Sequence, residues 1–153
     1  IKLNENIDLE KLQDSIVKAI NCHPYNKTTL FTDDKGNVRQ KRNDNDDVNI
    51  NVLDIDNLEN KYVFLKPFTL FDSPLYRINI IKTKTDNYLF IDFHHIISDG
   101  TSLSILFDDI SNIYLSKDVE KEKYSGFEAA LDEEKERQSE RYINAKEYYK
   151  NAK

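Results

Sequence analysis

Apolar residues recur at helical spacing in two segments of the chain. The first segment predicts a helix that ends near Cys22, with Asp8 as its N-cap and Pro24 just beyond its end. The second segment predicts a helix over residues 101–115. The two apolar stripes consist of Leu9, Leu12, Ile16 and Ile20, and of Leu103, Leu106, Phe107, Ile110 and Tyr114.

Strands are predicted where apolar and polar residues alternate, or where β-branched and aromatic residues are dense. We expect a hairpin around a turn at 33–37, because Gly36 suits a turn position with positive φ. A turn at 85–87 predicts a second hairpin, and a short helix is predicted over 56–65 with Asp56 as its cap. The strands are expected at 28–32, 38–41, 48–52, 75–83 and 88–93, and residues 1–3 read as the tail of another.

The C-terminal part of the sequence is strongly polar. Residues 116–125 are predicted to form a charged linker, and residues 127–152 a final helix. Lys135 and Gln138 interrupt the apolar face of that helix, so it is expected to lie across a surface or to bridge to another part of a longer protein. The apolar face would consist of Leu131, Tyr142, Ala145, Tyr149 and Ala152.

Composition narrows the class of protein. The 153 residues suit one domain, and the net charge of −6, without a basic and aromatic stripe, argues against a nucleic-acid surface. No apolar run approaches the roughly 18 residues of a membrane span, and no secretory signal opens the chain. Cys22 is the only cysteine, so a reducing, cytoplasmic location is expected. Because the chain lacks methionine and begins with Ile1, we expect a piece of a longer or processed polypeptide.

Two adjacent histidines lie where the last predicted strand meets the second predicted helix. If the strand continues to His95, alternation points His94 and His95 to opposite faces, so one of them can face a given cavity. A plain structural alternative is a strand end with an exposed histidine pair and Asp99 as a helix cap. The stretch reads His94-His95-Ile96-Ile97-Ser98-Asp99-Gly100.

This stretch resembles the His-His-x-x-x-Asp-Gly signature of condensation domains in nonribosomal peptide synthetases, which belong to the chloramphenicol acetyltransferase-like superfamily. Residues 19–28 resemble the family's Arg-His-x-x-Leu-Arg-Thr motif through His23 and Thr28, with Lys27 in place of the second Arg. Two further segments resemble the Pro-Phe-Asp-Leu…Pro-Leu-x-Arg run, at 67–77, and, weakly, the Tyr-x-Asp-Phe-Ala motif, at 124–129.

The resemblance implies an α+β fold. The expected architecture is a chloramphenicol acetyltransferase-like two-layer sandwich lobe, with a mixed or antiparallel sheet and helices on one face. Residues 1–153 would be the N-terminal lobe of a two-lobed condensation domain whose C-terminal lobe is absent from this chain. In that arrangement an acyl tunnel runs between the lobes, and the histidine motif lies at its floor.

The resemblance also implies an acyltransferase that joins a carrier-bound acyl or aminoacyl thioester to a carrier-bound amino acid through an amide bond. By motif position, His95 would accept or relay a proton, and His94 would support it. Asp99 would pair with a cation and hold the loop in shape, with Lys27 and Arg77 as alternative partners. Gly100 would let the backbone approach a substrate, with amides at the helix start facing an oxyanion.

The expected partners also follow from the resemblance. No directly bound cofactor is implied, because partner carrier proteins would supply 4'-phosphopantetheine. The other expected partner is the missing C-terminal lobe of the same domain, with no nucleic acid and no membrane. The isolated chain is expected to be inactive, since it would hold one wall of the tunnel.

Other functions remain open at this point. A related His-x-x-x-Asp-Gly acyltransferase, similar to wax ester synthases, would use an acyl-CoA, whereas a non-catalytic lobe would serve in docking. A metal site would be built from His95, Asp99 and either His94 or His23. It is disfavoured because opposite-facing histidines do not easily ligate one ion. A Cys22 nucleophile assisted by His23 is also disfavoured, because adjacent side chains near a helix end point in different directions.

Overall fold

The computed structural model of the chain describes residues 1–56, 58 and 61–152. It divides into two compact units, Ile1–Lys121 and Glu122–Lys153. The first unit contains the strands and two α-helices, and the second contains two further α-helices. The predicted α+β class is therefore confirmed.

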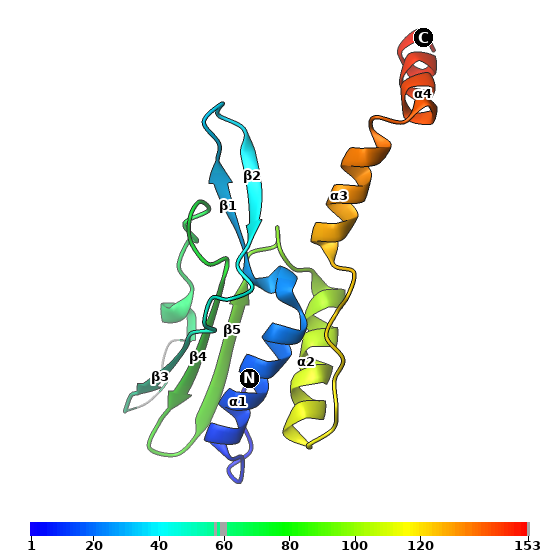
Figure 1. Ribbon diagram of the computed structural model, residues 1–153. Coiled ribbons are helices and arrows are strands. Elements are labelled where there is room, and N and C mark those ends of the chain that lie inside the picture. The colour runs from blue at the N-terminus through cyan, green and yellow to red at the C-terminus, as the bar shows by residue number, and fades with distance from the viewer. Residues whose placement is uncertain (57, 59–60, 153) are drawn as a thin grey trace. The chain divides into compact units, whose positions relative to one another are not determined.

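A three-stranded sheet forms the centre of the first unit (Figure 1). Its strands are β3 (Ile50–Asp54), β4 (Tyr76–Lys82) and β5 (Asn87–Phe93), in the order β3-β4-β5. β3 runs parallel to β4, and β4 runs antiparallel to β5 through a short turn. The sheet is therefore mixed, as predicted.

The N-terminal residues extend this sheet beyond β5. The Leu3 N–H donates to the carbonyl of Asn87 at 2.8 Å, and the Leu89 N–H donates to the carbonyl of Ile1 at 2.9 Å. Residues 1–3 thus form the short strand segment that the sequence suggested. Because of them, β5 has hydrogen-bonded neighbours on both sides.

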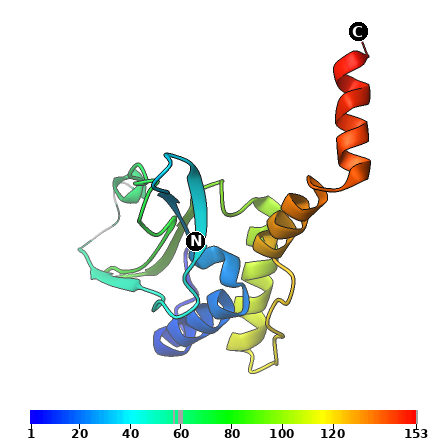
Figure 2. The same cartoon turned by 45° about the horizontal axis from the view of Figure 1, so that its top comes forward.

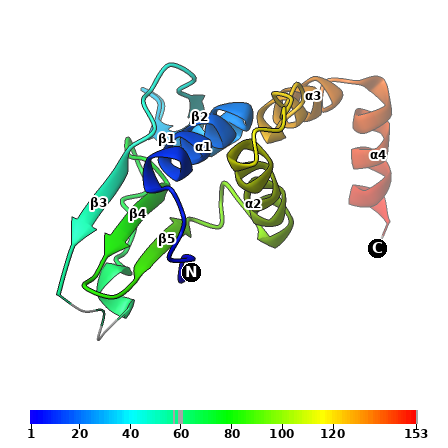
Figure 3. The ribbon, with the colours of Figure 1, turned by 90° about the horizontal axis from the view of Figure 1, so that it is seen from below.

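Two helices, α1 (Leu9–Cys22) and α2 (Gly100–Tyr114), lie side by side on one face of the sheet (Figure 2 and Figure 3). Asp8 caps α1 as predicted, because its carboxylate accepts the Lys11 N–H at 3.0 Å. The apolar stripes of both helices meet the inward residues of β4 and β5, which gives the predicted sandwich with helices on one face. The buried core consists of Leu12, Ile16, Ala19, Ile20, Ile78, Ile80, Leu89, Leu106 and Ile110.

The opposite face of the sheet carries a mixture of polar and aromatic side chains. The Asn51 side-chain amide donates to Asn79 Oδ1 at 3.0 Å, and the rings of Phe64 and Phe90 lie 5.7 Å apart. Beside them an apolar groove of about 340 Å³ reaches Ile81. The groove is lined by Ile1, Lys2, Leu58, Tyr62, Phe64, Leu65, Ile81, Tyr88, Leu89 and Phe90.

A separate two-stranded hairpin consists of β1 (Thr28–Thr32) and β2 (Val38–Arg42), as predicted. Asp33 closes its turn by accepting the backbone N–H of Asn37 at 2.8 Å. This hydrogen bond is the main reason why the pKa of Asp33 is lowered to about 2. Gly36 has φ +81°, the turn conformation that its sequence position predicted.

Two short 3₁₀ helices complete the first unit: η1 (Pro24–Lys27) and η2 (Lys61–Phe64). The helix predicted over 56–65 falls partly on residues 57, 59 and 60, which lie outside the described residues.

The second unit contains α3 (Gly126–Glu136) and α4 (Glu140–Asn151), so the single helix predicted over 127–152 is wrong. Ser139 interrupts it, because its backbone is extended and its side chain accepts the Tyr142 N–H at 3.1 Å. Residues 116–125, predicted as a linker, contain neither helix nor strand. Within the part of the chain that the structure describes, no helix is both long and apolar enough to cross a membrane.

Candidate functional site

The histidine motif forms a tight turn between β5 and α2. β5 ends at Phe93 and α2 begins at Gly100. The Ile97 N–H donates to the carbonyl of His94 at 3.1 Å, which closes the turn. The His94 N–H donates to the carbonyl of Leu75 at 2.8 Å, which ties the turn to the residue that precedes β4.

Ile97 anchors the turn from the inside. Its side chain is 4% exposed and packs with Leu30 and Leu75 in a small cluster apart from the main core. The neighbouring Ile96 is 48% exposed. The turn therefore buries one of its two isoleucines and leaves the other in solvent, and this difference fixes its orientation.

His94 is half-buried and held through its ring. Its Nδ1 accepts the backbone N–H of Ile96 at 3.1 Å, so the neutral ring carries its proton on Nε2. The ring also lies nearly perpendicular to that of Phe68, at 84°, with 5.8 Å between the ring centroids.

His95, in contrast, is exposed. β5 ends at Phe93, before both histidines, so the condition under which strand alternation would place them on opposite faces is not met. What separates the two residues is their environment: the ring of His94 is engaged by the protein, whereas that of His95 is presented to solvent.

Asp99 is the N-cap of α2. Its Oδ1 accepts the backbone N–H and the hydroxyl of Ser102, each at 2.8 Å. The backbone hydrogen bond from Ser102 is the main cause that lowers the pKa of Asp99, followed by the Ser102 hydroxyl, with a smaller contribution from the Thr101 amide. The structural alternative in which Asp99 caps a helix therefore describes its contacts correctly.

The predicted cation partners of Asp99 are both wrong. Among the described residues no ion pair joins Asp99 to Lys27 or to Arg77. Lys27 is turned toward a different loop, and Arg77 pairs with Asp92 across the β4–β5 hairpin. The carboxylate of Asp99 is held by hydrogen bonds from Ser102 at the start of α2, and not by a salt bridge.

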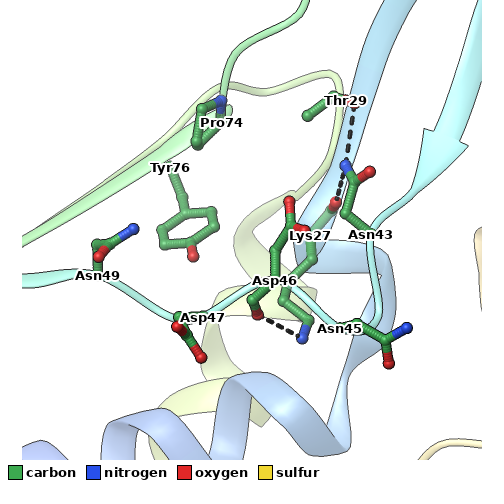
Figure 4. Close-up of a pocket in the computed structure, with 9 residues that line it drawn as sticks. All are labelled: Lys27, Thr29, Asn43, Asn45, Asp46, Asp47, Asn49, Pro74 and Tyr76. Carbon is green, nitrogen blue, oxygen red and sulfur yellow. Dashed lines mark hydrogen bonds between the residues drawn. The ribbon is translucent and has the colours of Figure 1, made fainter.

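Lys27 holds the loop that leads from β2 to β3. It is 6% exposed, and its Nζ donates to Asn21 Oδ1 at 2.9 Å and to the carbonyl of Asp46 at 3.0 Å. It also donates to the carbonyl of Asp44. Figure 4 shows the ammonium group directed at the carbonyl of Asp46. These three oxygens satisfy the three donors of a buried ammonium group.

A polar pocket of about 420 Å³ lies beside Lys27 (Figure 4). The Asn43 side-chain amide crosses it to donate to the carbonyl of Lys27 at 3.1 Å and to Thr29 Oγ1 at 3.0 Å. Burial raises the pKa of Tyr76, which forms part of the wall. The pocket is lined by Lys27, Thr29, Asn43, Asn45, Asp46, Asp47, Asn49, Pro74 and Tyr76.

Arg77 joins the sheet to the connector that precedes β4. Its Nε lies 3.4 Å from Asp92 Oδ2, directly across the antiparallel pair. Its Nη2 donates to the carbonyl of Pro67 at 3.4 Å, and its Cζ lies 3.9 Å from the centre of the Phe68 ring. Arg77 therefore fixes the segment whose Phe68 ring contacts His94.

Gly100 is the first residue of α2. A Cβ on Gly100 would meet no atom of the described residues within 4 Å, so packing inside the chain does not require glycine here. The nearby amide of Ser102 donates to the carboxylate of Asp99 at 2.8 Å. The expectation that amides at the helix start face an oxyanion is therefore wrong for Ser102, and it stays a prediction for the other amides.

The other candidate reactive residues, His23 and Cys22, are not arranged for catalysis or for metal binding. His23 Nε2 lies 2.7 Å from Asp109 Oδ2 and so links the end of α1 to α2. Burial raises the pKa of the Cys22 thiol, which disfavours the thiolate that a nucleophile would need. Among the residues that the structure describes, no group of three or more His, Cys, Asp and Glu side chains could hold a metal ion.

A comparison with known protein families agrees with the resemblance that the histidine motif showed. The family model described as Condensation domain matches residues 1–152. The chain belongs to the condensation domain family. The match covers the whole turn and both units of the chain.

Known relatives of this condensation domain chain are large synthetases. It is 28% identical over 153 residues to surfactin synthase subunit 1 of Bacillus subtilis (strain 168). The aligned region covers 97% of this chain and 4% of that protein. It is 30% identical over 117 residues to gramicidin S synthase 2 of Aneurinibacillus migulanus, which covers 74% of this chain and 3% of that protein. The chain thus spans a small part of the relatives that it matches.

Solved structures share the fold. The epimerization domain from the third module of tyrocidine synthetase B matches with a TM-score of 0.74 at 20% identity, over 99% of this chain and 38% of that one. The X-domain from teicoplanin biosynthesis matches with a TM-score of 0.76 at 18% identity, over 94% of this chain and 35% of that one. The chloramphenicol acetyltransferase-like architecture expected from the sequence is thereby confirmed.

Sequence reasoning missed two residues of this condensation domain site. Phe68 was part of a matched motif but had no assigned role, and Asp92 had none either. The signal for Asp92 was present, because a β4–β5 hairpin with a turn at 85–87 places Arg77 opposite Asp92. The contact of Phe68 with His94 had no such signal, since Phe68 lies in an irregular connector.

Proposed function

We propose that this chain contributes the reactive histidine of a condensation domain, which joins a carrier-bound acyl or aminoacyl thioester to a carrier-bound amino acid. The observation that carries the proposal is the contrast inside the turn. His95 is exposed, while His94 beside it is held by Ile96 and Phe68. Such a turn offers one imidazole to a substrate on a fixed backbone.

The reaction needs a group that moves a proton. The acceptor amine attacks the thioester carbonyl, a tetrahedral oxyanion forms, and the C–S bond breaks as the amide C–N bond remains. One proton leaves the amine nitrogen, and the departing sulfur gains one. A neutral imidazole, with a reference pKa of about 6.5, can accept and pass on that proton near pH 7. We assign this role to His95.

The other motif residues support the turn in this proposal. Asp99 fixes the start of α2 through Ser102, and His94 fixes the backbone on both sides of His95. The open space beside Gly100 supports a substrate position at this end of the helix. Lys27 and Arg77 act further away, on the loop before β3 and on the connector before β4.

The proposed partners are carrier proteins that present both substrates on 4'-phosphopantetheine arms, which makes the arm part of the substrate and not a resident cofactor. A second proposed partner is the remaining lobe of the domain, because this chain matches 38% of the solved epimerization domain. We expect the 153-residue chain alone to form no amide product, since bimolecular acyl transfer depends on holding both substrates in place.

The test is the substitution His95→Ala in the natural polypeptide that contains this chain. Product formation from loaded donor and acceptor carriers should fall by about 10²–10⁴-fold, as is typical when a general base is removed. His23→Gln is the matched control, because His23 contacts Asp109 away from the turn and should leave turnover near the wild-type rate. Mass spectrometry of the amide product measures both.

The same assay separates the other two functions. Near-normal product formation by His95→Ala would overturn the assignment of the reactive histidine. Turnover with an acyl-CoA donor, but not with a loaded carrier, would indicate the acyl-CoA-dependent class. No product from the wild-type polypeptide with any donor, together with specific carrier binding, would indicate a docking lobe.

A further inference from the structure

Phe68 occupies an unusual place in the connector that precedes β4. Between residues 65 and 72 every residue except Phe68 is exposed. Phe68 alone turns inward, where it packs against the small cluster that contains Leu75 and Ile97. An inward aromatic side chain in an otherwise exposed segment indicates that its contacts hold the segment in place.

One contact of Phe68 leads back to the sheet. The Arg77 guanidinium lies over the ring, with 3.9 Å from Cζ to the ring centre. The same guanidinium lies 3.4 Å from Asp92 on the neighbouring strand, and its side chain is 20% exposed. Asp92 therefore keeps Arg77 in place, and Arg77 keeps one side of the Phe68 ring in place.

The other contact of Phe68 leads to the histidine turn. The rings of Phe68 and His94 are nearly perpendicular, at 84° and 5.8 Å between centroids. The His94 ring accepts the Ile96 N–H through Nδ1. Because His94 and Ile96 flank His95 in the chain, this hydrogen bond restricts the backbone of the residue between them.

We propose that Phe68 is a positioning residue: its ring, held by Arg77, orients the His94 ring and thereby fixes the turn that presents His95. The proposal rests on the proposed function only for the expected effect on catalysis, because the effect on His94 can be measured without any turnover. Phe68 does not act on the substrate itself. It limits the conformations of His95 through its contact with the neighbouring His94.

The test is Phe68→Leu, which keeps an apolar side chain and removes the ring. In the wild-type chain, ¹⁵N spectra of the imidazoles should show His94 with its proton on Nε2 alone. In Phe68→Leu, His94 should become a mixture of both tautomers. Exchange of the Ile96 amide should accelerate by roughly 2- to 10-fold, the factor that corresponds to an aromatic pair. Phe68→Tyr keeps the ring and should restore the wild-type values.

Phe71→Leu is the matched control, because Phe71 lies in the same connector and is 41% exposed. It should leave the His94 tautomer and the Ile96 exchange rate unchanged. If Phe68→Leu leaves both unchanged as well, the proposal is wrong. It is equally wrong if Phe71→Leu shifts them as strongly as Phe68→Leu does.

A second variant covers the case in which Phe68→Leu does not fold. Arg77→Lys keeps a positive charge near Asp92 but removes the planar group that lies over Phe68. It should shift the His94 tautomer in the same direction, by less than Phe68→Leu. Wild-type values in a folded Arg77→Lys protein would contradict the proposal.

Failure of this inference and failure of the proposed function give different results. In the natural polypeptide, Phe68→Leu should lower kcat by roughly 2- to 10-fold without changing KM for the carriers. A full response of His94 to Phe68→Leu, together with normal turnover by His95→Ala, would leave the positioning effect intact and overturn the function. The reverse pattern would overturn the positioning effect alone.

Discussion

The two faces of the central sheet differ in what their side chains contact. On one face, Ile78 and Ile80 are fully buried under α1 and α2. On the other face, the same strand presents Arg77, Asn79 and Ile81, which contact polar partners, aromatic rings and an open groove. Adjacent residues of β4 therefore lie in different environments, because successive side chains of a strand point to opposite faces of the sheet.

The difference shows how stability and orientation are separated in this molecule. Burial of an isoleucine side chain contributes about 1.5–3 kcal/mol, whereas a typical hydrogen bond contributes about 0.5–1.5 kcal/mol net. The helix-covered face therefore dominates the free energy of folding. The opposite face contains directional contacts, and those of Arg77 lead to the connector and to the histidine turn.

The largest expected effect compares two neighbouring residues. Ile80→Ala should lower the free energy of unfolding by about 2–5 kcal/mol, because it leaves a cavity between the sheet and the helices. Ile81→Ala should fall at the lower end of that range, because its site borders an open groove that solvent and side chains can fill. Urea unfolding of both variants measures the difference. Equal losses would show that the two faces contribute alike.

A smaller effect is expected from the ion pair on the opposite face. Asp92→Asn removes the charge that faces Arg77, and should cost about 1 kcal/mol or less, since the Asp92 side chain is 22% exposed. Asp56→Asn is the control, because the Asp56 side chain in its pair with Lys84 is 83% exposed. Thermal unfolding should detect the first change and not the second. A larger loss in the control would contradict the importance of partial burial.

The smallest effect concerns Asp99, in the turn that follows the sheet. Its pKa is lowered in the folded state by the Ser102 hydrogen bonds, so its charged form stabilises the fold above the unfolded pKa of about 3.9. That contribution should disappear as the pH falls through the lower folded value. Asp99→Asn keeps a capping oxygen but cannot titrate. The difference in melting temperature between wild type and Asp99→Asn should therefore shrink between pH 7 and strong acid. A difference that is constant with pH would exclude this role.

Local features of this fold were predictable from the sequence. Asp8 and the apolar stripe after it predicted α1, because both the cap and the face are set by neighbouring residues. The β1–β2 hairpin followed from its turn residues in the same way. The predicted change from strand β5 to helix α2 was also correct. Asp99 marks the start of the helix, because its side chain accepts the free backbone N–H of Ser102.

The errors have a common physical cause. A motif names residue types but not the directions of their side chains, so it could not tell that Lys27 faces the carbonyl of Asp46 while Asp99 faces Ser102. The break at Ser139 was missed because the surrounding residues are good helix formers, and a single cap decided the outcome. The parallel pairing of β3 with β4 depends on contacts distant in sequence.

The position of α1 has a consequence for synthesis on the ribosome. Its apolar stripe packs on β4 and β5, and Leu89 follows Ile20 by 69 residues. At about 5–20 residues per second, the ribosome adds these residues in roughly 3 to 14 seconds. β4 is added before this interval ends, but the cover of the apolar face of α1 stays incomplete until β5 follows. Until β5 emerges, the apolar face of α1 is therefore open to chaperones and to premature association.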